Sequence, residues 1–373
     1  MKIKHVHFYV ENAKVWRDWF VHKLGFQALG TNMSSYHTHT EVVKSGSVCF
    51  LLSSALLPIS PVAEFLSQHP PGVADIAFGV KNVEDMISRA QAHGVKVLQP
   101  VQSSQQGQEY IKSGKIAAWG SLSHTLIEIA TEKITDGTDD LSATRLVSNF
   151  DVTSAPKSVS YFTNLDHVVL NVAAGELERA VAWYENVLGF QPQQIFKIKT
   201  TRSALHSQVM VSPNGSVQFP INEPASSNSQ IQEFLDVNRG AGIQHIALGT
   251  CNLIPVIAKL RANGLCLLPA PRDYYSQIQQ RGRFPLSLDE LQAVAQQEIL
   301  VDWQDNHSLE DTKLTPVLLQ IFTQPIFGQP TFFFEFIERR YQARGFGEGN
   351  FRALFKAIEN EQLKRGSLKD SVT

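Results

Sequence analysis

Three side chains in the second half of the chain could bind a metal ion together. His167, His245 and Glu335 each lie in a run of alternating apolar residues, which is the pattern of a half-buried strand. An ionised carboxylate on an apolar face is costly unless it is paired, protonated or bound to a cation. Two neutral imidazoles and one carboxylate form the facial triad that suits iron(II) and leaves positions open for substrate and dioxygen. The three residues are therefore a candidate iron(II) site.

Either histidine, taken alone, is also compatible with a hydrogen-bonded core residue. An internal repeat favours the metal site. The sequence LGFQ occurs at 24–27 and again at 188–191, each time after a histidine-containing strand pattern and an apolar helix pattern. GVADIAFG at 72–79 matches GIQHIALG at 242–249 in the same way. The repeat predicts four strand–helix–strands modules, two per half, with the three candidates at corresponding strand positions.

The first half offers a weaker counterpart of the same set. From the repeat we equate the three candidates with His5, Asp75 and Glu128. We expect this set to be structural and free of metal, because the first half lacks the additions that the second half carries. Two further histidines, His37 and His39, could bind a metal ion, but an exposed strand or turn is the simpler interpretation.

The strand and helix patterns around these residues predict an α+β fold with two domains. We place the domains at 1–135 and 160–373, joined by a polar, turn-rich linker at about 131–160. We expect the first domain to serve structure or assembly. The second carries an insertion at 270–316, in which a capping box at 287–290 predicts a helix. The apolar side of that helix is predicted to hold Leu288, Leu291, Val294, Ala295 and Ile299.

A C-terminal helix is predicted over 350–364, after a glycine-rich hinge at 345–350. Asn350 is a suitable N-cap. The apolar positions of the helix have helical spacing, at Phe351, Leu354, Phe355 and Ile358. The first half has no such segment. We therefore expect the helix to act as a lid over the candidate site.

The composition is that of a globular protein of 373 residues, 43% hydrophobic and 18% charged. A formal net charge of -2 argues against a broad basic face for nucleic acid or an anionic membrane. The 22 phenylalanines predict an apolar, water-excluding interior. Cys49, Cys251 and Cys266 lack the spacing of a metal site, and we expect the last two to be small buried side chains. Because neither a signal peptide nor a membrane-length apolar run is present, we expect a cytoplasmic protein.

Several long motifs resemble the 4-hydroxyphenylpyruvate dioxygenase family, over essentially the whole chain and most densely from 160 to 365. They are SQIQEFLD at 229–236, GAGIQHIAL at 240–248, LLQIFT at 318–323, PTFFFEFIER at 330–339 and GFGEGNFRALF at 345–355. The resemblance implies the vicinal-oxygen-chelate, or glyoxalase-like, fold. In that fold tandem βαβββ modules form two open, barrel-like domains.

The resemblance also implies roles for individual residues. His167, His245 and Glu335 match the iron ligands of the family, with one Fe(II) per chain in the second domain. Residues that match its substrate pocket are Ser207, Asn222, Gln230, Gln244, Gln320, Phe322, Phe333, Phe346 and Phe351. Strand alternation points Gln244 away from His245, so we expect Gln244 behind the ligands. The phenylalanines are also compatible with plain core positions.

The implied reaction converts 4-hydroxyphenylpyruvate and dioxygen to homogentisate and carbon dioxide. It combines oxidative decarboxylation, ring hydroxylation and side-chain migration, and homogentisate serves tyrosine breakdown or prenylquinone synthesis. The nearest alternative is 4-hydroxymandelate synthase, which hydroxylates the benzylic carbon of the same substrate. That family typically has threonine in place of Ser207 and an aliphatic residue in place of Asn222. A metal-free binding protein of the same fold is the third possibility. We expect no nucleic-acid partner and a homo-oligomer.

Overall fold

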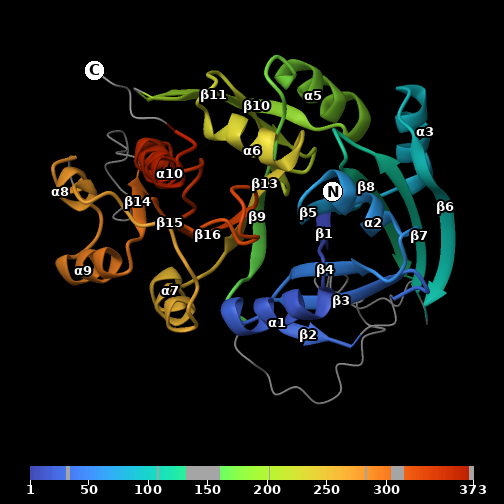
Figure 1. Cartoon of the computed structure of the whole chain (residues 1–373), viewed down its shortest axis with the longest axis horizontal. Coiled ribbons are helices and arrows are strands. Elements are labelled where there is room, and N and C mark those ends of the chain that lie inside the picture. The colour runs from blue at the N-terminus through green and yellow to red at the C-terminus, as the bar shows by residue number, and fades with distance from the viewer. Residues whose placement is uncertain are drawn as a thin grey trace.

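The computed structural model describes residues 1–30, 34–106, 109–131, 160–200, 202–281, 284–303 and 315–368. Within these ranges the chain forms two mixed sheets of eight strands each. Each sheet curves into an open half-barrel (Figure 1). The predicted linker at 131–160 lies almost wholly outside the described residues. None of the described helices is long and apolar enough to cross a membrane.

The first sheet consists of two copies of the predicted module. Its order is β2-β3-β4-β1-β5-β8-β7-β6, so the first strands of both modules, β1 and β5, pair antiparallel at its centre. The strands are β1 (Lys2–Tyr9), β2 (Gln27–Leu29), β3 (Thr38–Ser45), β4 (Val48–Ala55), β5 (Gly72–Gly79), β6 (Val97–Gln106), β7 (Glu109–Ala117) and β8 (Ser123–Thr131). The helices between them are α1 (Ala13–Leu24), α2 (Pro61–Gln68) and α3 (Val83–Ala92).

The second sheet repeats this order as β10-β11-β12-β9-β13-β16-β15-β14. The strands are β9 (Asn164–Asn171), β10 (Gln191–Lys199), β11 (Ala204–Val211), β12 (Gln218–Pro224), β13 (Gly242–Gly249), β14 (Leu300–Trp303), β15 (Val317–Phe322) and β16 (Phe333–Arg340). The helical segments are α5 (Leu177–Trp183) with η1 (Tyr184–Leu188), α6 (Gln230–Asn238), α7 (Leu253–Ala262), α8 (Tyr274–Gln279), α9 (Leu288–Gln296), η2 (Glu348–Asn350) and α10 (Phe351–Arg365). The predicted α+β fold of tandem βαβββ modules is therefore confirmed.

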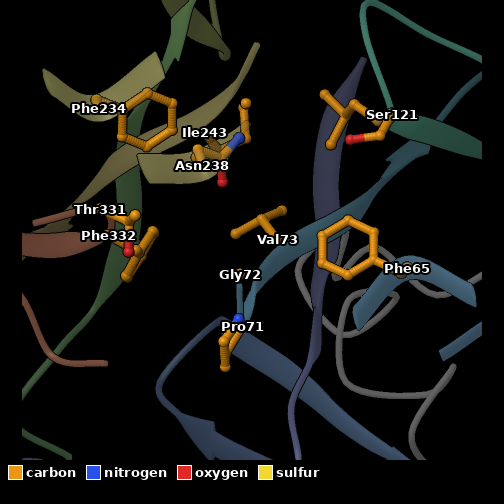
Figure 2. A pocket seen from close by; sticks show the side chains of 12 residues that line it. Phe65, Pro71, Gly72, Val73, Ser121, Phe234, Asn238, Ile243, Thr331 and Phe332 are labelled. Carbon is orange, nitrogen blue, oxygen red and sulfur yellow. The ribbon is translucent and has the colours of Figure 1, made fainter. Parts of the chain in front are cut away.

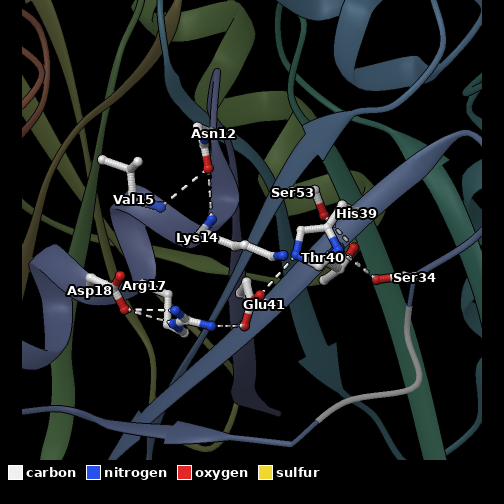
Figure 3. Close-up of polar contacts among 10 residues, drawn as sticks. All are labelled: Asn12, Lys14, Val15, Arg17, Asp18, Ser34, His39, Thr40, Glu41 and Ser53. Carbon is white, nitrogen blue, oxygen red and sulfur yellow. Dashed lines mark hydrogen bonds and ion pairs between the residues drawn. The ribbon is translucent and has the colours of Figure 1, made fainter.

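Short polar residues define where the helices begin. Asn12 precedes α1, and its side-chain oxygen accepts hydrogen bonds from the backbone N–H groups of Lys14 and Val15 (Figure 3). Ser287 caps α9 by accepting from the N–H of Glu290, as the capping box predicts. These caps satisfy backbone donors that a helix cannot pair internally.

The structure corrects several details of the second half. Strand β14 replaces β6 in the repeated order, so the predicted insertion at 270–316 is too wide and the added helices are α8 and α9. Leu288 is 82% exposed because it is the first residue of α9 and lies off its buried side. Cys251 and Cys266 are exposed, whereas we expected them to be buried.

The two halves share one hydrophobic core, and one face of β16 is buried in that core. Phe332 and Phe334 contact the Phe8 and Phe50 rings of the first sheet, with centroids 5.1 and 5.8 Å apart. Close to this core a small cavity lies between the halves, where Val73 of the first faces Phe332 of the second (Figure 2). Much of the phenylalanine surplus thus joins the two halves.

Candidate metal centre and substrate pocket

A pocket of about 90 Å³ lies between the second sheet and α10. In Figure 1 this helix lies between the β10–β11 edge of the sheet and the β14–β15 edge. The four predicted apolar positions of α10, Phe351, Leu354, Phe355 and Ile358, all line the pocket. The predicted lid helix therefore covers the concave side of the sheet.

The pocket brings all the predicted site residues of the second half together. The three candidate ligands line it, and so do Ser207, Asn222, Gln230, Gln244, Gln320, Phe322, Phe333, Phe346 and Phe351. These residues come from six strands, two helices and the loop between β16 and η2, so only the folded half-barrel can assemble them. The twelve residues thus line one continuous pocket.

His167, His245 and Glu335 converge at one wall of the pocket. They lie on β9, β13 and β16, which are neighbours in the sheet, and β13 is the middle one of the three. Glu335 Oε2 is 3.1 Å from His167 Nε2 and 3.7 Å from His245 Nε2. One ligand atom from each residue lies within 4.8 Å of the others. Two nitrogens and one oxygen at this spacing fit a single first-row metal ion with open positions.

The electrostatics of the three residues also fit a cation. Burial alone would lower the pKa of His167, but the negative charges of Glu335 and Asp166 raise it to about 9. Burial and the adjacent His167 lower the pKa of His245 well below its ordinary value. Among the described residues, the buried Nδ1 of His245 has no hydrogen-bond partner. A divalent ion would take the place of the proton held between His167 and Glu335, because ligating imidazoles are neutral.

Gln244 lies in the pocket wall beside His245, which differs from our expectation. The pairing of β13 with β9 shifts register between Ile243 and His245. Such an irregularity adds a residue to one strand and re-aims its side chains. Strict alternation therefore fails at this point, and Gln244 is in contact with the pocket rather than behind it.

Polar groups lie on two sides of the otherwise apolar pocket. Ser207 and Asn222 are directly opposite each other on β11 and β12, and the Asn222 amide donates to Asn171 Oδ1 at 3.3 Å. Gln320 Nε2 lies 3.4 Å from Glu335 Oε1. The Gln320 oxygen in turn accepts a hydrogen bond from Asn350 Nδ2 at 3.1 Å.

Asn350 precedes α10 but does not cap it, which corrects our prediction. Its side chain makes no hydrogen bond to the helix, because it points into the fold. There it donates to Gln320 and accepts a 2.7 Å hydrogen bond from the Tyr274 hydroxyl. Sequence reasoning gave Tyr274 no role. The link from α8 through Asn350 to Gln320 instead fixes where α10 begins.

Sequence reasoning also missed the apolar wall and the neighbours of the ligands. Further lining residues are Val169, Phe196, Ile198, Leu205, Val209, Pro220 and Ile231. Asp166 Oδ1 lies 3.0 Å from His167 Nδ1, and Arg339 contacts the same carboxylate. Asp166 directly precedes the candidate ligand His167, and this position was the one sequence feature that could have indicated its role. Nothing in the local pattern marks Arg339.

The counterpart of Glu335 in the first half is Thr125, not Glu128. Ala247 lies opposite His167 on one side and Glu335 on the other. In the first sheet Ala77 lies opposite His5 and Thr125 in the same way. Our equation of Glu128 with Glu335 was therefore wrong, by three positions.

Glu128 has a structural role that it shares with Glu338. Glu128 Oε2 accepts from the N–H of Val83 at 2.9 Å, and Glu338 Oε2 accepts from the N–H of Leu253 at 2.6 Å. Each carboxylate, on the last strand of its module, thus binds the first N–H of the helix of the same module, α3 or α7. A carboxylate is favourable there because the helix dipole is positive at that end.

Several of the polar groups in the first half form hydrogen bonds and ion pairs with one another. Asp75 accepts hydrogen bonds from Ser123 and Thr125 at 2.7 and 2.8 Å, and Lys115 Nζ lies 3.5 Å from it. The nearby His7 pairs with Ser53 at 2.7 Å.

The two other histidines considered as metal ligands, His39 and His37, also have protein partners. His39 contacts Glu41 at 2.8 Å, and Arg17 binds the same carboxylate (Figure 3). His37 pairs locally with Ser35 and Thr38.

Comparison with known proteins adds independent information on the family. The model of the Glyoxalase/Bleomycin resistance protein/Dioxygenase superfamily matches residues 2–112 and 164–281. The 4-hydroxyphenylpyruvate dioxygenase of Coccidioides posadasii is 38% identical, over 98% of this chain and 94% of that protein. The enzyme of the same name from Yarrowia lipolytica is 36% identical, over 98% and 93%.

A solved structure supports the same fold. A mutant of 4-hydroxymandelate synthase from Streptomyces coelicolor superposes with a TM-score of 0.80 at 24% identity. The superposition covers 97% of this chain and 98% of that one. At this identity the similarity shows the fold alone, whereas the full-length sequence matches carry the family. The chain belongs to the glyoxalase/bleomycin resistance protein/dioxygenase superfamily and, within it, to the 4-hydroxyphenylpyruvate dioxygenase family.

Proposed function

We propose that this protein is a 4-hydroxyphenylpyruvate dioxygenase. It converts 4-hydroxyphenylpyruvate and dioxygen to homogentisate and carbon dioxide. The observation that carries the proposal is the position of the three metal-binding side chains. They form one wall of a pocket that is otherwise lined by aromatic, aliphatic and amide side chains and is covered by α10. Full-length relatives of that name support it.

The proposed cofactor is one Fe(II) per chain, held by His167, His245 and Glu335. Two imidazoles and one carboxylate suit iron(II) and leave room for a chelating 2-oxo acid. When bound, the iron would activate dioxygen, and the electrons that reduce dioxygen would come from the substrate as it is decarboxylated and hydroxylated. No further cofactor is needed, because the substrate carries its own 2-oxo acid group.

The side chains of the pocket orient the substrate and exclude water. Amide and hydroxyl groups of Ser207, Asn222, Gln230, Gln244 and Gln320 supply donors and acceptors for its oxygen atoms. The rings of Phe322, Phe333, Phe346 and Phe351 enclose the aromatic ring of the substrate. A closed α10 keeps water and external reductants away from reactive species.

Hydroxylation of the benzylic carbon, which gives 4-hydroxymandelate, is the competing outcome. Ser207 and Asn222 support homogentisate formation, because both match the dioxygenase pattern and both lie in the pocket wall. The direct test is product analysis after anaerobic loading with iron(II), addition of 4-hydroxyphenylpyruvate, and exposure to air. Homogentisate is the expected product. Hydroxymandelate would identify the synthase, and neither product with no oxygen uptake would indicate a binding protein.

We also propose that this protein is cytoplasmic and that it forms a homo-oligomer through its first half. Exposed apolar side chains gather there at Tyr36, Leu56, Leu57 and Ile59. The backbone N–H groups of Leu56 and Leu57 bind the carbonyl of His37, which brings the two segments together. Sedimentation should show an oligomer that Leu57→Lys weakens. A monomeric wild-type chain would contradict this part of the proposal.

A further inference from the structure

Arg339 lies between the metal-binding wall and the hinge that precedes α10. It is four residues beyond Glu335 on β16 and contacts both sides. Its Nε and one terminal nitrogen donate to the two oxygens of Asp166, each at 2.7 Å. A bidentate pair of this kind is strong and fixes the orientation of both planes.

Asp166 carries this orientation to a ligand. Its Oδ1 lies 3.0 Å from His167 Nδ1, so His167 presents its other nitrogen, Nε2, to the pocket. A carboxylate behind a ligating histidine sets the tautomer and the angle of the ring.

The other terminal nitrogen of Arg339 holds the hinge. It donates to the carbonyl of Gly345 at 2.8 Å and to that of Ala343 at 3.3 Å. Gly345 has a positive φ of 84°, and an added Cβ would meet Glu348, so the backbone there needs glycine. The next residue, Phe346, packs edge-on against the His167 ring, with centroids 5.1 Å apart. The hinge therefore contacts His167 directly and also through Arg339 and Asp166.

The first half shows what the fold looks like without this link. The strand register aligns His5 with His167 and Thr125 with Glu335. The counterpart of Asp166 is then Lys4, and that of Arg339 is Ile129. The half without the metal-binding set thus lacks both members of the pair. The fold itself does not require them, since the two sheets have the same strand order.

We propose that Arg339 is a positioning residue that couples the hinge of α10 to the metal ligand His167. The inference rests on the proposed metal site. Metal binding fixes His167, and through Asp166 and Arg339 it holds residues 343–346 in the position that closes α10. Coupling of two equilibria is reciprocal, so a closed α10 strengthens metal binding to the same extent.

The test compares Arg339→Met with Arg340→Met in the full-length chain. Arg340 is the matched control, because it lies on the same strand with a similar side-chain exposure, 21% against 20%. Its ion pairs go instead to Glu338 and Glu290, away from the pocket. Two quantities are measured anaerobically. One is the iron(II) affinity, by competition with a chelator, and the other is hydrogen–deuterium exchange of residues 345–365 with and without iron(II).

In the wild type and in Arg340→Met, iron(II) should slow exchange of residues 345–365. In Arg339→Met, iron(II) affinity should fall roughly 10–100-fold. Exchange of 345–365 in that variant should no longer respond to iron(II), even when the site is saturated. Equal affinity and an equal exchange response in the two variants would overturn the coupling. Absence of iron binding to the wild type would overturn the metal site itself.

Discussion

At the scale of single residues, the two histidines are supported in different ways. The Nδ1 of His167 is hydrogen-bonded to Asp166, whereas the Nδ1 of His245 has no hydrogen-bond partner among the described residues. The ring of His245 is instead stacked on Phe333, at 4.8 Å and 18° between planes. The orientation of His245 thus depends on packing, and that of His167 on a hydrogen bond. Phe333 both supports the His245 ring and forms part of the pocket wall.

The product of the reaction should depend on Asn222. Asn222→Ile replaces an amide that lies opposite Ser207 with an apolar group of similar size. We expect oxygen uptake to continue while the fraction of homogentisate falls and hydroxymandelate or uncoupled products appear, because the proposed polar contact between Asn222 and the substrate would be lost. Chromatography of the products measures the ratio. An unchanged homogentisate fraction would show that Asn222 does not direct the reaction.

At the scale of elements, β16 connects the chemistry to the fold. Alternate residues point to opposite sides of the strand. Phe333 and Glu335 line the pocket, while Phe334 and Phe336 are buried in the core shared with the first half. Core packing on one face therefore sets the position of the carboxylate on the other. The sequence alone places these phenylalanines on both sides of Glu335 and does not show which of them enter the pocket.

Several elements could be predicted from the sequence because they follow regular patterns, whereas most of the pocket residues were expected only from the resemblance to a known family. The alternating strands and the apolar face of α10 were predictable for this reason. The irregular features were not. The register shift beside Gln244 changes which face it occupies, and Asn350 binds Gln320 in place of the helix. Arg339 contacts Asp166 across the sheet, a pairing that no local spacing reveals.

The far end of α10 is held by a separate set of contacts. Arg365 and Ser367 both bind Glu233 on α6, at 3.0 and 2.5 Å. Glu233→Gln should weaken this attachment, so residues near 365 should exchange deuterium faster and oxygen uptake should exceed homogentisate formation. Asp236→Asn is the control, because Asp236 lies on the same helix and binds Gln232. Tight coupling in Glu233→Gln would show that the contacts do not keep the lid closed.

At the scale of the whole molecule, the two sheets have the same topology but different polar interiors. The first keeps His5 and Asp75, with Thr125 in place of the glutamate and Lys115 as the neighbouring cation. The second has all three candidate metal ligands, His167, His245 and Glu335. The repeat in the sequence predicts the duplication correctly. It does not locate Thr125, because a glutamate three residues later offers a false match.

The contact between the halves should make the protein sensitive to acid. His124 is fully buried and binds the Tyr184 hydroxyl at 3.1 Å, and burial lowers the pKa of His124 to about 4. Between pH 6.5 and 4 the unfolded chain takes up a proton that the folded chain does not, so stability falls as the pH falls. This shift corresponds to roughly 3 kcal/mol.

Denaturant unfolding of His124→Gln at several pH values tests this expectation. The variant should lose less stability than the wild type between pH 6.5 and 4, whatever its stability at neutral pH. His22→Gln removes an exposed imidazole on α1 and serves as the control. Parallel pH profiles for the wild type and His124→Gln would show that the buried imidazole does not determine this behaviour.

Iron(II) stoichiometry tests most directly the central claim that only the second half holds the metal. The metal-free, full-length chain is titrated anaerobically with iron(II), together with Glu335→Ala and Thr125→Ala. We predict one tightly bound iron per chain in the wild type and in Thr125→Ala. In Glu335→Ala, tight binding should be lost while the circular dichroism is unchanged. Two irons in the wild type, or one iron retained in Glu335→Ala, would contradict the account.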